Sequence, residues 1–397
     1  MKNESPKYRY DKFNENWIIV KLSDIACHYK TGGTPSTKDP TFWGGAIPWI
    51  QSSDIQKDSL FGVIPQKFIS EEGLQNSTAK LIPKNSIAIV TRVGVGKLAI
   101  IDQDYTTSQD FLSLSDFNGD TQFIAYSIYR MLQKESTQLQ GTSIKGITKE
   151  DLLSKKISLP EIEEQSAIGS LFRTLDNLLS SYKDNLANYQ SLKATMLSKM
   201  FPKAGQTVPE IRLDGFEGEW ENSKISDYVY LLNGRAFKQD ELLNEGKYRV
   251  VRVGNFNTNE KWYYSNLELE ENKYADKEDL LYLWATNFGP EIWKEEKIIF
   301  HYHIWKLEFD RSIIDRNYLY YWLEKDKKRI QQNTNGSTMV HVTKSMMENR
   351  EFLFPMFREQ QAIGTYFSNL DNLIAAHQEK ISQLETLKKK LLQDMFI

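Results

Sequence analysis

Four glycine-containing stretches carry residue types that could bind phosphates. Lys30–Ser36 reads Lys-Thr-Gly-Gly-Thr-Pro-Ser, and Leu232–Lys238 reads Leu-Asn-Gly-Arg-Ala-Phe-Lys at the corresponding place in the second half. Gly141–Lys149 and Gly336–Lys344 place hydroxyl side chains after a glycine and end on Thr-Lys. Glycines let a backbone approach a phosphate, and hydroxyls and cations donate hydrogen bonds to it. The same residues also form ordinary turns and helix caps, so both readings stay open.

Arginines in the segment Tyr248–Asn255 add a second kind of candidate. Arg249 and Arg252 could reach guanines or phosphates, or could pair with the many nearby glutamates. The full set of candidate DNA contacts is Lys30, Thr34, Ser36, Lys38, Arg92, Lys97, Ser143, Lys145, Thr148, Lys149, Arg235, Lys238, Arg249, Arg252, Asn255, Thr338, His341 and Lys344.

The segment Thr91–Lys97 is an incomplete phosphate-binding loop. A P-loop needs a glycine where Thr91 stands and Ser or Thr where Leu98 stands. Gly94 and Gly96 lack the third glycine and the acidic residue of a dinucleotide fingerprint. We therefore expect no nucleotide cofactor to be bound here.

A pair of histidines is the nearest approach to a metal site. His301 and His303 flank Tyr302 in a predicted strand, Ile298–Ile304, which puts both imidazoles on one face. Two histidines alone rarely hold a metal, and ordinary strand histidines explain them as well. The sequence predicts no metal site and no catalytic residue, so we expect no enzyme activity.

Composition indicates a soluble globular protein. The chain has 397 residues, 40% of them hydrophobic, and a formal net charge of −3. This length predicts two or three domains, and the charge argues against a polybasic coat without excluding DNA binding. We expect a cytoplasmic protein with no membrane span. Cys27 is the single cysteine, so a disulfide within the chain is excluded.

The elements that must position these candidates are duplicated. Glu164–Phe201 returns as Glu359–Phe396, shifted by 195 positions. Both copies begin Glu-Gln-x-Ala-Ile-Gly, continue with Leu-Asp-Asn-Leu and end on Met-Phe. Pro6–Asp24 likewise returns as Pro209–Asp227, including a shared arginine, phenylalanine and tryptophan. The chain therefore resembles a homodimer fused head to tail.

Each copy of the first repeat predicts a long helix. Apolar residues recur at steps of three and four without a proline, and Glu164–Met200 would form a rod of roughly 55 Å at about 1.5 Å per residue. One apolar stripe needs a partner, so the two helices should pack together. The residues expected to pack are Leu171, Leu175, Leu178, Tyr182, Tyr189, Leu192, Met196, Tyr366, Leu370, Leu373, Leu384, Leu387 and Leu391.

Polar residues interrupt this predicted seam. They are Asn185 in the first copy, and His377 and Lys380 in the second. Such residues can fix the register of a helix pair at some cost in stability, or can face outward. The spacing does not choose between these alternatives.

Between the repeats lies strand and loop sequence that differs between the halves. Ser86–Val90 and Phe111–Ser115 read as strands, and Asp120 reads as the N-cap of a helix. Asp315 is the matching cap in the second half. We predict an α+β fold of two duplicated domains separated by two antiparallel helices with pseudo-two-fold symmetry. The predicted boundaries are 1–162 and 221–357 for the domains, 163–201 and 358–397 for the helices, and 202–220 for the linker.

This combination resembles the DNA-specificity subunits of type I restriction-modification systems. The motifs that carry the resemblance are the two Leu-Asp-Asn-Leu helices, Thr-Gly-Gly-Thr-Pro-Ser and Ile-Pro-Trp-Ile in the first half, and Val208–Trp220 at the entry to the second. The resemblance covers essentially the whole chain. The departure at Asn233–Lys238 makes contacts of the second domain harder to assign than those of the first.

The resemblance implies a function in DNA recognition. Each target-recognition domain would read a few base pairs of double-stranded DNA, and the helix pair would act as a ruler between two unlike half-sites. The subunit would dock two adenine methyltransferase subunits, and through that complex restriction subunits. S-adenosylmethionine, ATP and magnesium would belong to those partners. The alternatives are a coiled-coil protein-binding scaffold without DNA readout, and an enzyme with an unrecognised site.

Overall fold

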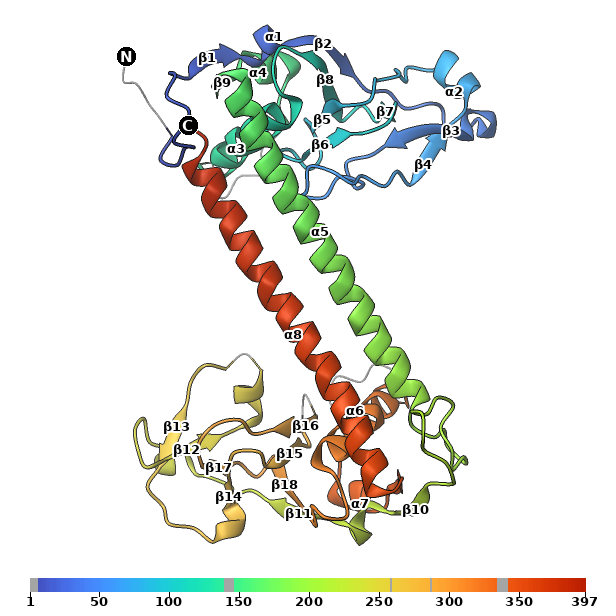
Figure 1. Cartoon of the computed structure of the whole chain (residues 1–397), viewed down its shortest axis with the longest axis vertical. Coiled ribbons are helices and arrows are strands. Elements are labelled where there is room, and N and C mark those ends of the chain that lie inside the picture. The colour runs from blue at the N-terminus through green and yellow to red at the C-terminus, as the bar shows by residue number, and fades with distance from the viewer. Residues whose placement is uncertain (1–5, 139–145, 258, 286–287, 334–341) are drawn as a thin grey trace. The chain divides into compact units, whose positions relative to one another are not determined.

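The computed structural model describes residues 6–138, 146–257, 259–285, 288–333 and 342–397. The chain divides into two compact units (Figure 1). Unit 1 comprises Met1–Asn185 and His377–Ile397, and unit 2 comprises Leu186–Ala376. Both long helices therefore contribute to both units.

Unit 1 is an α+β domain built on an antiparallel sheet of order β2-β8-β5-β6, with a second, three-stranded sheet of order β4-β3-β7. In the second sheet β3 runs parallel to β7, and β1 pairs separately with β9. Its elements are β1 (Ile18–Lys21), α1 (Leu22–Ile25), β2 (Ala26–Thr31), η1 (Pro40–Phe42), β3 (Trp43–Ile50), β4 (Lys67–Ile69), α2 (Glu71–Gln75), β5 (Ser86–Val90), β6 (Leu98–Ile101), β7 (Thr106–Thr107), β8 (Phe111–Phe117), α3 (Thr121–Gln138), α4 (Lys149–Ser154) and β9 (Lys156–Leu159).

Unit 2 has the same layout. Its sheets have the orders β11-β18-β15-β16 and β13-β12-β17-β14, and β12 runs parallel to β17. Its elements are β10 (Glu221–Lys224), η2 (Ile225–Asp227), β11 (Val229–Asn233), η3 (Gln239–Glu241), β12 (Tyr248–Val251), η4 (Val253–Phe256), β13 (Tyr263–Ser265), η5 (Glu271–Lys273), β14 (Tyr274–Ala275), β15 (Leu280–Leu283), β16 (Gly289–Ile292), β17 (Ile298–Phe300), β18 (Ile304–Phe309), α6 (Arg316–Asn333), α7 (Lys344–Glu348) and β19 (Glu351–Phe354).

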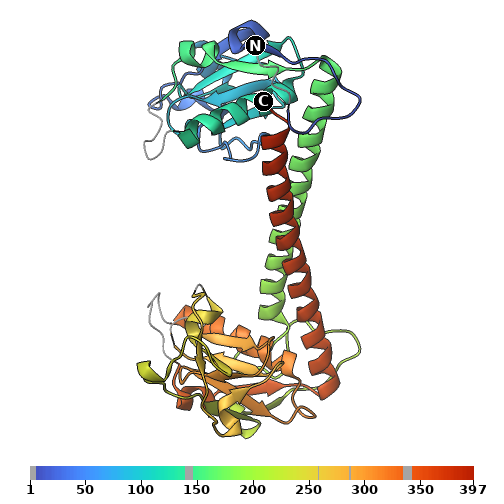
Figure 2. The same ribbon diagram turned by 90° about the vertical axis from the view of Figure 1, so that its left-hand side faces the viewer.

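One helix covers a face of the main sheet in each unit (Figure 2). Asp120 caps α3, because its Oδ1 accepts a hydrogen bond from the Phe123 amide at 2.8 Å, and Asp315 caps α6 in the same way through the Tyr318 amide. Apolar side chains of the two helices are buried against the sheets. The strands predicted at Ser86–Val90 and Phe111–Ser115 and both caps are confirmed.

The long helices are α5 (Ile162–Lys199) and α8 (Phe357–Asp394). They run antiparallel in unit 1, where Asp176 pairs with Lys388 and Lys183 pairs with Glu385 at 2.7 Å. Among the described residues, no helix is long and apolar enough to cross a membrane.

The residues that face inward follow a seven-residue pattern that is the same in both helices. On α5 they include Phe172, Leu175 and Leu179, and on α8 the positions 195 residues later, including Phe367 and Leu370. Buried and half-buried positions continue along α5 at 182, 186, 189 and 193, and along α8 at 377, 381, 384 and 388. The seam therefore repeats with the duplication.

The predicted seam was partly out of phase. Leu175, Leu370 and Leu384 are buried as expected, Leu171, Tyr182, Tyr189, Met196, Tyr366 and Leu391 are half-buried, and Leu178, Leu192, Leu373 and Leu387 are exposed. Two leucine stripes run side by side on each helix, and periodicity alone does not tell which one faces the partner helix. Of the polar interruptions, Asn185 and Lys380 face outward and His377 is half-buried in the seam.

An ion pair between the long helices occurs in each unit, with the roles of the helices exchanged. In unit 1 Lys388 pairs with Asp176, whose other oxygen accepts from the Tyr126 hydroxyl at 2.6 Å. In unit 2 the residues shifted by 195 positions repeat the pattern, because Lys193 pairs with Asp371 at 2.5 Å and Asp371 accepts from Tyr321 at 2.7 Å. Burial and the nearby carboxylate raise the pKa of Tyr126 and of Tyr321, which keeps both phenols protonated as donors.

Candidate nucleic-acid interface

In each unit the ends of several strands meet at one place, which we call the strand-end junction. It consists of Gly33, Gln51, Thr91, Ser108 and Asp110 in unit 1, and of Arg235, Arg252, Trp284, His301 and His303 in unit 2. These residues follow β2, β3, β5 and β7 in unit 1, and β11, β12, β15 and β17 in unit 2.

The same backbone hydrogen bonds build both junctions. In unit 1 the bonds are Gly33 N to Thr107 O (2.9 Å), Ser108 N to Ile50 O (2.9 Å), Thr91 N to Asp110 O (2.8 Å) and Ile147 N to Thr91 O (2.7 Å). In unit 2 the matching bonds, in the same order, are Arg235 N to Phe300 O (3.0 Å), His301 N to Val251 O (2.9 Å), Trp284 N to His303 O (3.1 Å) and Val342 N to Trp284 O (3.0 Å). A common frame therefore presents different side chains.

The turn after β3 and the turn after β12 are also equivalent. The Gln51 amide donates to Asp54 Oδ2 at 3.0 Å, and the Asp54 amide donates back to the Gln51 carbonyl at 3.0 Å. Arg252 and Asn255 repeat this reciprocal pair at 3.0 and 2.9 Å. Gln51 and Arg252 thus occupy one position of a rigid capped turn.

A glycine is required at one corner of each junction. A Cβ on Gly32 would lie 2.1 Å from the Ser108 carbonyl oxygen, and a Cβ on Gly234 would lie 2.3 Å from the His301 carbonyl oxygen. Both distances are below any real carbon contact, so only glycine lets these strands approach. This explains why one glycine is common to Lys30–Ser36 and Leu232–Lys238.

The junction of unit 2 is rich in cations stacked on aromatic rings. The guanidinium of Arg235 lies 4.6 Å from the centre of the Phe237 ring, and that of Arg252 lies 4.3 Å from the Tyr263 ring. Arg235 also pairs with Glu241 at 2.6 Å. The Nε of Arg252 is buried and has no hydrogen-bond partner among the described residues. Stacking holds a guanidinium in place while leaving donors available at its edge.

The histidines lie in a turn rather than in the strand that the sequence predicted. β17 ends at Phe300 and β18 begins at Ile304, so His301 to His303 connect two strands. Burial, followed by the positive charges of His303 and Arg252, lowers the pKa of His301 to about 4. His301 is therefore a neutral imidazole near pH 7, able to donate and accept hydrogen bonds. Within the described ranges, no group of three or more metal-ligating residues was found.

The junction of unit 1 contains no cation among its five residues, because Gly33, Gln51, Thr91 and Ser108 are uncharged and Asp110 is acidic. The Trp49 indole donates to the Gly33 carbonyl at 2.9 Å, and the Thr91 hydroxyl donates to the Asp110 carbonyl at 3.0 Å. Arg92, next to Thr91, is exposed. Since Thr91 and Ser108 are buried, unit 1 offers the amide of Gln51 and the carboxylate of Asp110, with the cation Arg92 at the edge. Unit 2 offers arginine and imidazole groups at the equivalent place.

Several predicted contacts serve the fold itself. The ammonium groups of Lys30, Lys97 and Lys344 donate to backbone carbonyls, and Arg249 pairs with Glu295 at 2.5 Å. The hydroxyl of Thr148 caps α4, as that of Thr343 caps α7. The side-chain oxygen of Asn255 caps its turn, and Lys149 lies 4.4 Å from the Tyr29 ring centre. The alternative structural readings of Thr148 and Arg249 are thereby confirmed.

Other predicted contacts are exposed. They are Thr34, Ser36, Lys38, Arg92 and Lys238. Ser143, Lys145, Thr338 and His341 lie outside the described residues. None of these observations tests contact with DNA, so the role of these residues as DNA contacts stays a prediction.

The incomplete phosphate-binding loop Thr91–Lys97 connects two antiparallel strands, β5 and β6. A P-loop leads from a strand into a helix whose N-terminus holds the phosphates, and here a strand follows instead. Gly94 and Gly96 adopt positive φ angles of 89° and 95°, as a tight turn requires. The sequence-based rejection of a nucleotide site agrees with this geometry.

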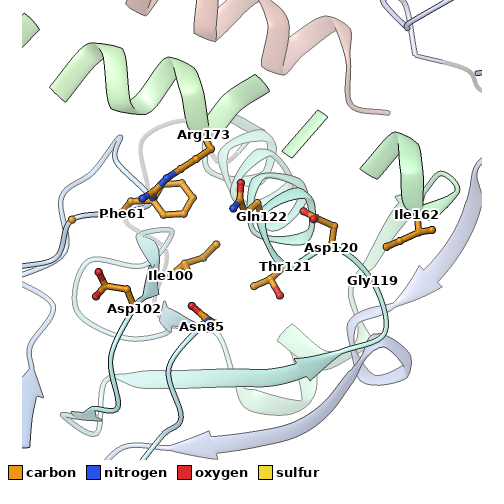
Figure 3. Close-up of a pocket in the computed structure, with 11 residues that line it drawn as sticks. Phe61, Asn85, Ile100, Asp102, Gly119, Asp120, Thr121, Gln122, Ile162 and Arg173 are labelled. Carbon is orange, nitrogen blue, oxygen red and sulfur yellow. The ribbon is translucent and has the colours of Figure 1, made fainter. Parts of the chain in front are cut away.

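A separate cavity of about 540 Å³ lies in unit 1 beside the start of α3 (Figure 3). Its wall includes Asn85, Thr121 and the guanidinium of Arg173, which lies 3.6 Å from the Phe61 ring centre. In unit 2 the counterparts of Asn85 and Thr121 are Glu278 and Arg316, which form an ion pair. No histidine, cysteine or lysine lines the cavity, and its mixed charge defines no reaction.

Sequence reasoning missed several members of the junctions. Gln51 is far in the chain from Ser108 and Asp110, and none of the three is itself part of a motif. Strand pairing brings them together, since β3 runs parallel to β7 and β8 follows directly. The signal that could have found them is positional: each directly follows a strand or sits in the tight connection after it.

Two units with one fold, each presenting its own junction, define a duplicated α+β protein with two unlike surfaces. The profile of the type I restriction modification DNA specificity domain matches residues 14–188 and 217–386. The chain therefore belongs to the family of type I restriction-modification DNA specificity subunits.

Two relatives and one solved structure are similar to this chain, one relative over about half of it and the others over nearly its whole length. The chain is 22% identical to the MjaVIII specificity subunit of Methanocaldococcus jannaschii over 407 residues, which covers 95% of this chain and 91% of that one. It is 32% identical to the EcoR124I/EcoR124II specificity subunit of Escherichia coli over 200 residues, covering 45% and 48% of the two chains. The crystal structure of the type I S subunit from M. genitalium has the same fold, with a TM-score of 0.66, 16% identity and 99% coverage of both chains.

Proposed function

We propose that this chain reads a bipartite, asymmetric site on double-stranded DNA, with one half-site for each unit. The observation that carries the proposal is the pair of strand-end junctions, in which one backbone frame presents an amide and a carboxylate in unit 1 and arginine and imidazole groups in unit 2. Recognition of two different sequences by one duplicated fold requires this combination of a fixed frame and variable side chains.

The groups at the junctions suit nucleic acid. Guanidinium groups recognise guanine edges and phosphates, and glutamine recognises adenine. Gly32 and Gly234 hold strands close together, so the side chains that follow are positioned by rigid backbone. Since the proposed target is genomic DNA, we place the protein in the cytoplasm.

We infer that methyltransferase subunits dock on the outer leucine stripe of the helix pair. This outer stripe consists of Leu178 and Leu192 on α5 and Leu373 and Leu387 on α8, which are between 39% and 43% exposed. Leu178 corresponds to Leu373, and Leu192 to Leu387, through the 195-residue shift. Each helix thus exposes two leucines fourteen residues apart beside its seam, with the polar Asn185 or Lys380 midway between them on the same face.

The duplication of the outer stripe supports two copies of an adenine methyltransferase subunit. Restriction subunits would join through that complex. In this proposal the chain itself is not catalytic, and S-adenosylmethionine, ATP and magnesium belong to the partner subunits. The chain supplies only position and sequence discrimination.

We also infer that α5 and α8 set the spacer between half-sites. Deleting seven residues from each helix, in register, should change the spacer length and leave both half-site sequences unchanged. A spacer of unaltered length in the methylated sites of that variant would refute the ruler.

Genomic adenine methylation in the source cell, compared with this coding sequence intact and deleted, tests the proposed function. Loss of one bipartite motif would establish it and would give both half-sites and the spacer. An unchanged methylome, together with purified complex whose binding to duplex DNA is absent or insensitive to salt, would favour the protein-binding scaffold instead.

A further inference from the structure

Gln51 and Arg252 are the same position in the two units. Gln51 follows β3, which runs parallel to β7, and Arg252 follows β12, which runs parallel to β17. Each begins a turn that is closed by the side chain three residues later, Asp54 or Asn255. The backbone carbonyl of the preceding residue accepts from the equivalent Ser108 or His301 amide at 2.9 Å. The two side chains therefore leave the same point of the same frame.

Both side chains have uncommitted polar groups. Arg252 has no carboxylate partner among the described residues, and stacking on Tyr263 fixes the plane of its guanidinium. The side-chain amide of Gln51 makes no hydrogen bond to any residue in the described ranges. The other arginines of this region differ, because Arg235 pairs with Glu241 and Arg249 pairs with Glu295.

We propose that this position reads one base pair in each half-site, with Arg252 selecting guanine and Gln51 selecting adenine. A guanidinium donates two hydrogen bonds to O6 and N7 of guanine, and a glutamine amide accepts from N6 and donates to N7 of adenine. The inference rests on the proposed DNA-reading function and adds which residues choose a base in each unit.

The occurrence of a glutamine in one unit and an arginine in the other, at the same position, favours contact with a base over contact with a phosphate. A phosphate contact gains most from a cation, and a neutral amide at the equivalent position would forfeit that gain. A base edge is read by an arginine and by a glutamine alike, each through two hydrogen bonds to a different purine. The neutral His301 beside Arg252 adds no competing positive charge near pH 7.

Exchanging the two side chains tests the proposal. The complete complex, with its methyltransferase subunits, is expressed in cells with the wild-type chain, with Arg252→Gln, or with Gln51→Arg, and the methylated motifs are read from the genome. We expect Arg252→Gln to replace one guanine by adenine in the second half-site, and Gln51→Arg to replace one adenine by guanine in the first. Each variant should favour its new base by about 5- to 150-fold in competition binding.

Two matched variants keep the test decisive. Arg252→Lys retains the charge but loses the two-pronged donor, so it should relax guanine selection at the same base pair. Arg311→Gln removes an arginine of unit 2 that pairs with Asp279 at 3.3 Å and is no candidate DNA contact, so it should leave the motif unchanged.

Each outcome bears on a different claim. A change confined to one base pair in the matching half-site supports the inference. An unchanged motif, whether methylated fully or uniformly less, overturns it and makes the position a structural or phosphate contact. A wild-type complex that methylates no bipartite motif overturns the proposed function as well.

Discussion

Unit 1 and unit 2 differ far more in their side chains than in their backbones. Both junctions are closed by the same inter-strand hydrogen bonds, and both require a glycine at Gly32 or Gly234. On this frame unit 1 places Gln51 and Ser108, where unit 2 places Arg252 and His301. The duplication has thus kept the residues that position a surface and changed those that the surface presents.

The ion pairs in the helix seam show the opposite behaviour. Lys388, Asp176 and Tyr126 are reproduced chemically by Lys193, Asp371 and Tyr321. What differs is burial, because the side chains of Lys388 and Asp176 are 8% and 7% exposed while those of Lys193 and Asp371 are 18% and 35% exposed. We therefore expect the two ion pairs to contribute unequally to the stability of their units, although they consist of the same residue types.

The largest expected effect comes from breaking these pairs. Lys388→Ala leaves Asp176 buried without its partner and should destabilise unit 1 by about 3–5 kcal/mol. Lys193→Ala should cost unit 2 only about 1 kcal/mol, because water reaches Asp371. Hydrogen exchange of α5 amides in each unit, measured in increasing denaturant, reports the two losses separately. Equal losses in the two units would contradict the role assigned to burial.

The next effect concerns the outer leucine stripe. Leu178→Asp or Leu373→Asp places a charge in the proposed methyltransferase interface and should weaken binding of one subunit by at least about 2 kcal/mol, roughly 30-fold. Native mass spectrometry of the purified complex would show the loss of one methyltransferase copy. Ser180→Asp, at an exposed position off the stripe, is the control and should leave the stoichiometry unchanged. Full occupancy in the leucine variants would exclude the stripe as the docking surface.

A pH dependence should distinguish the two junctions. The pKa of His301 is lowered to about 4 by burial, so unfolding at acidic pH takes up a proton that the folded state excludes. Unit 2 should lose stability as pH falls from about 6.5 to about 4, by about 1 kcal/mol after solvent screening. His301→Ser, which installs the residue found at the equivalent position of unit 1, should remove this part of the pH dependence in denaturant titrations. If the wild-type chain and His301→Ser lose stability identically with falling pH, protonation of His301 is not the cause of the loss.

The smallest expected effect is on DNA affinity at one edge of unit 1. Arg92 is exposed beside Thr91, and as a phosphate contact it should contribute about one unit to the slope of log K against log salt. Arg92→Ala should lower that slope without altering the methylated motif. A changed motif in this variant would make Arg92 a base-reading residue instead.

The sequence predicted the parts of the fold that are local or repeated. The caps at Asp120 and Asp315 and the strand Ser86–Val90 depend on neighbouring residues, and the 195-residue shift is visible by comparing the chain with itself. The seam was harder, since Leu178 and Leu179 both fit a helical stripe and only packing places Leu179 inside.

The candidate site was less predictable, because it forms from residues that meet only through long-range pairing. Gln51 follows the Ile-Pro-Trp-Ile motif and Trp284 follows no motif, and the place of both in the junctions becomes evident only when β3 pairs with β7 and β15 with β18. Gly32, in the segment Lys30–Ser36 that the sequence singled out, is required for a close strand approach toward Ser108, a requirement that the sequence did not reveal.

The most direct measurement of the central claim is the methylome of a chimaera in which residues 18–160 are replaced by the corresponding region of another family member. If each unit reads its own half-site, the methylated motif will change in one half only, with the other half and the spacer retained. A motif altered in both halves would contradict independent recognition by the two units.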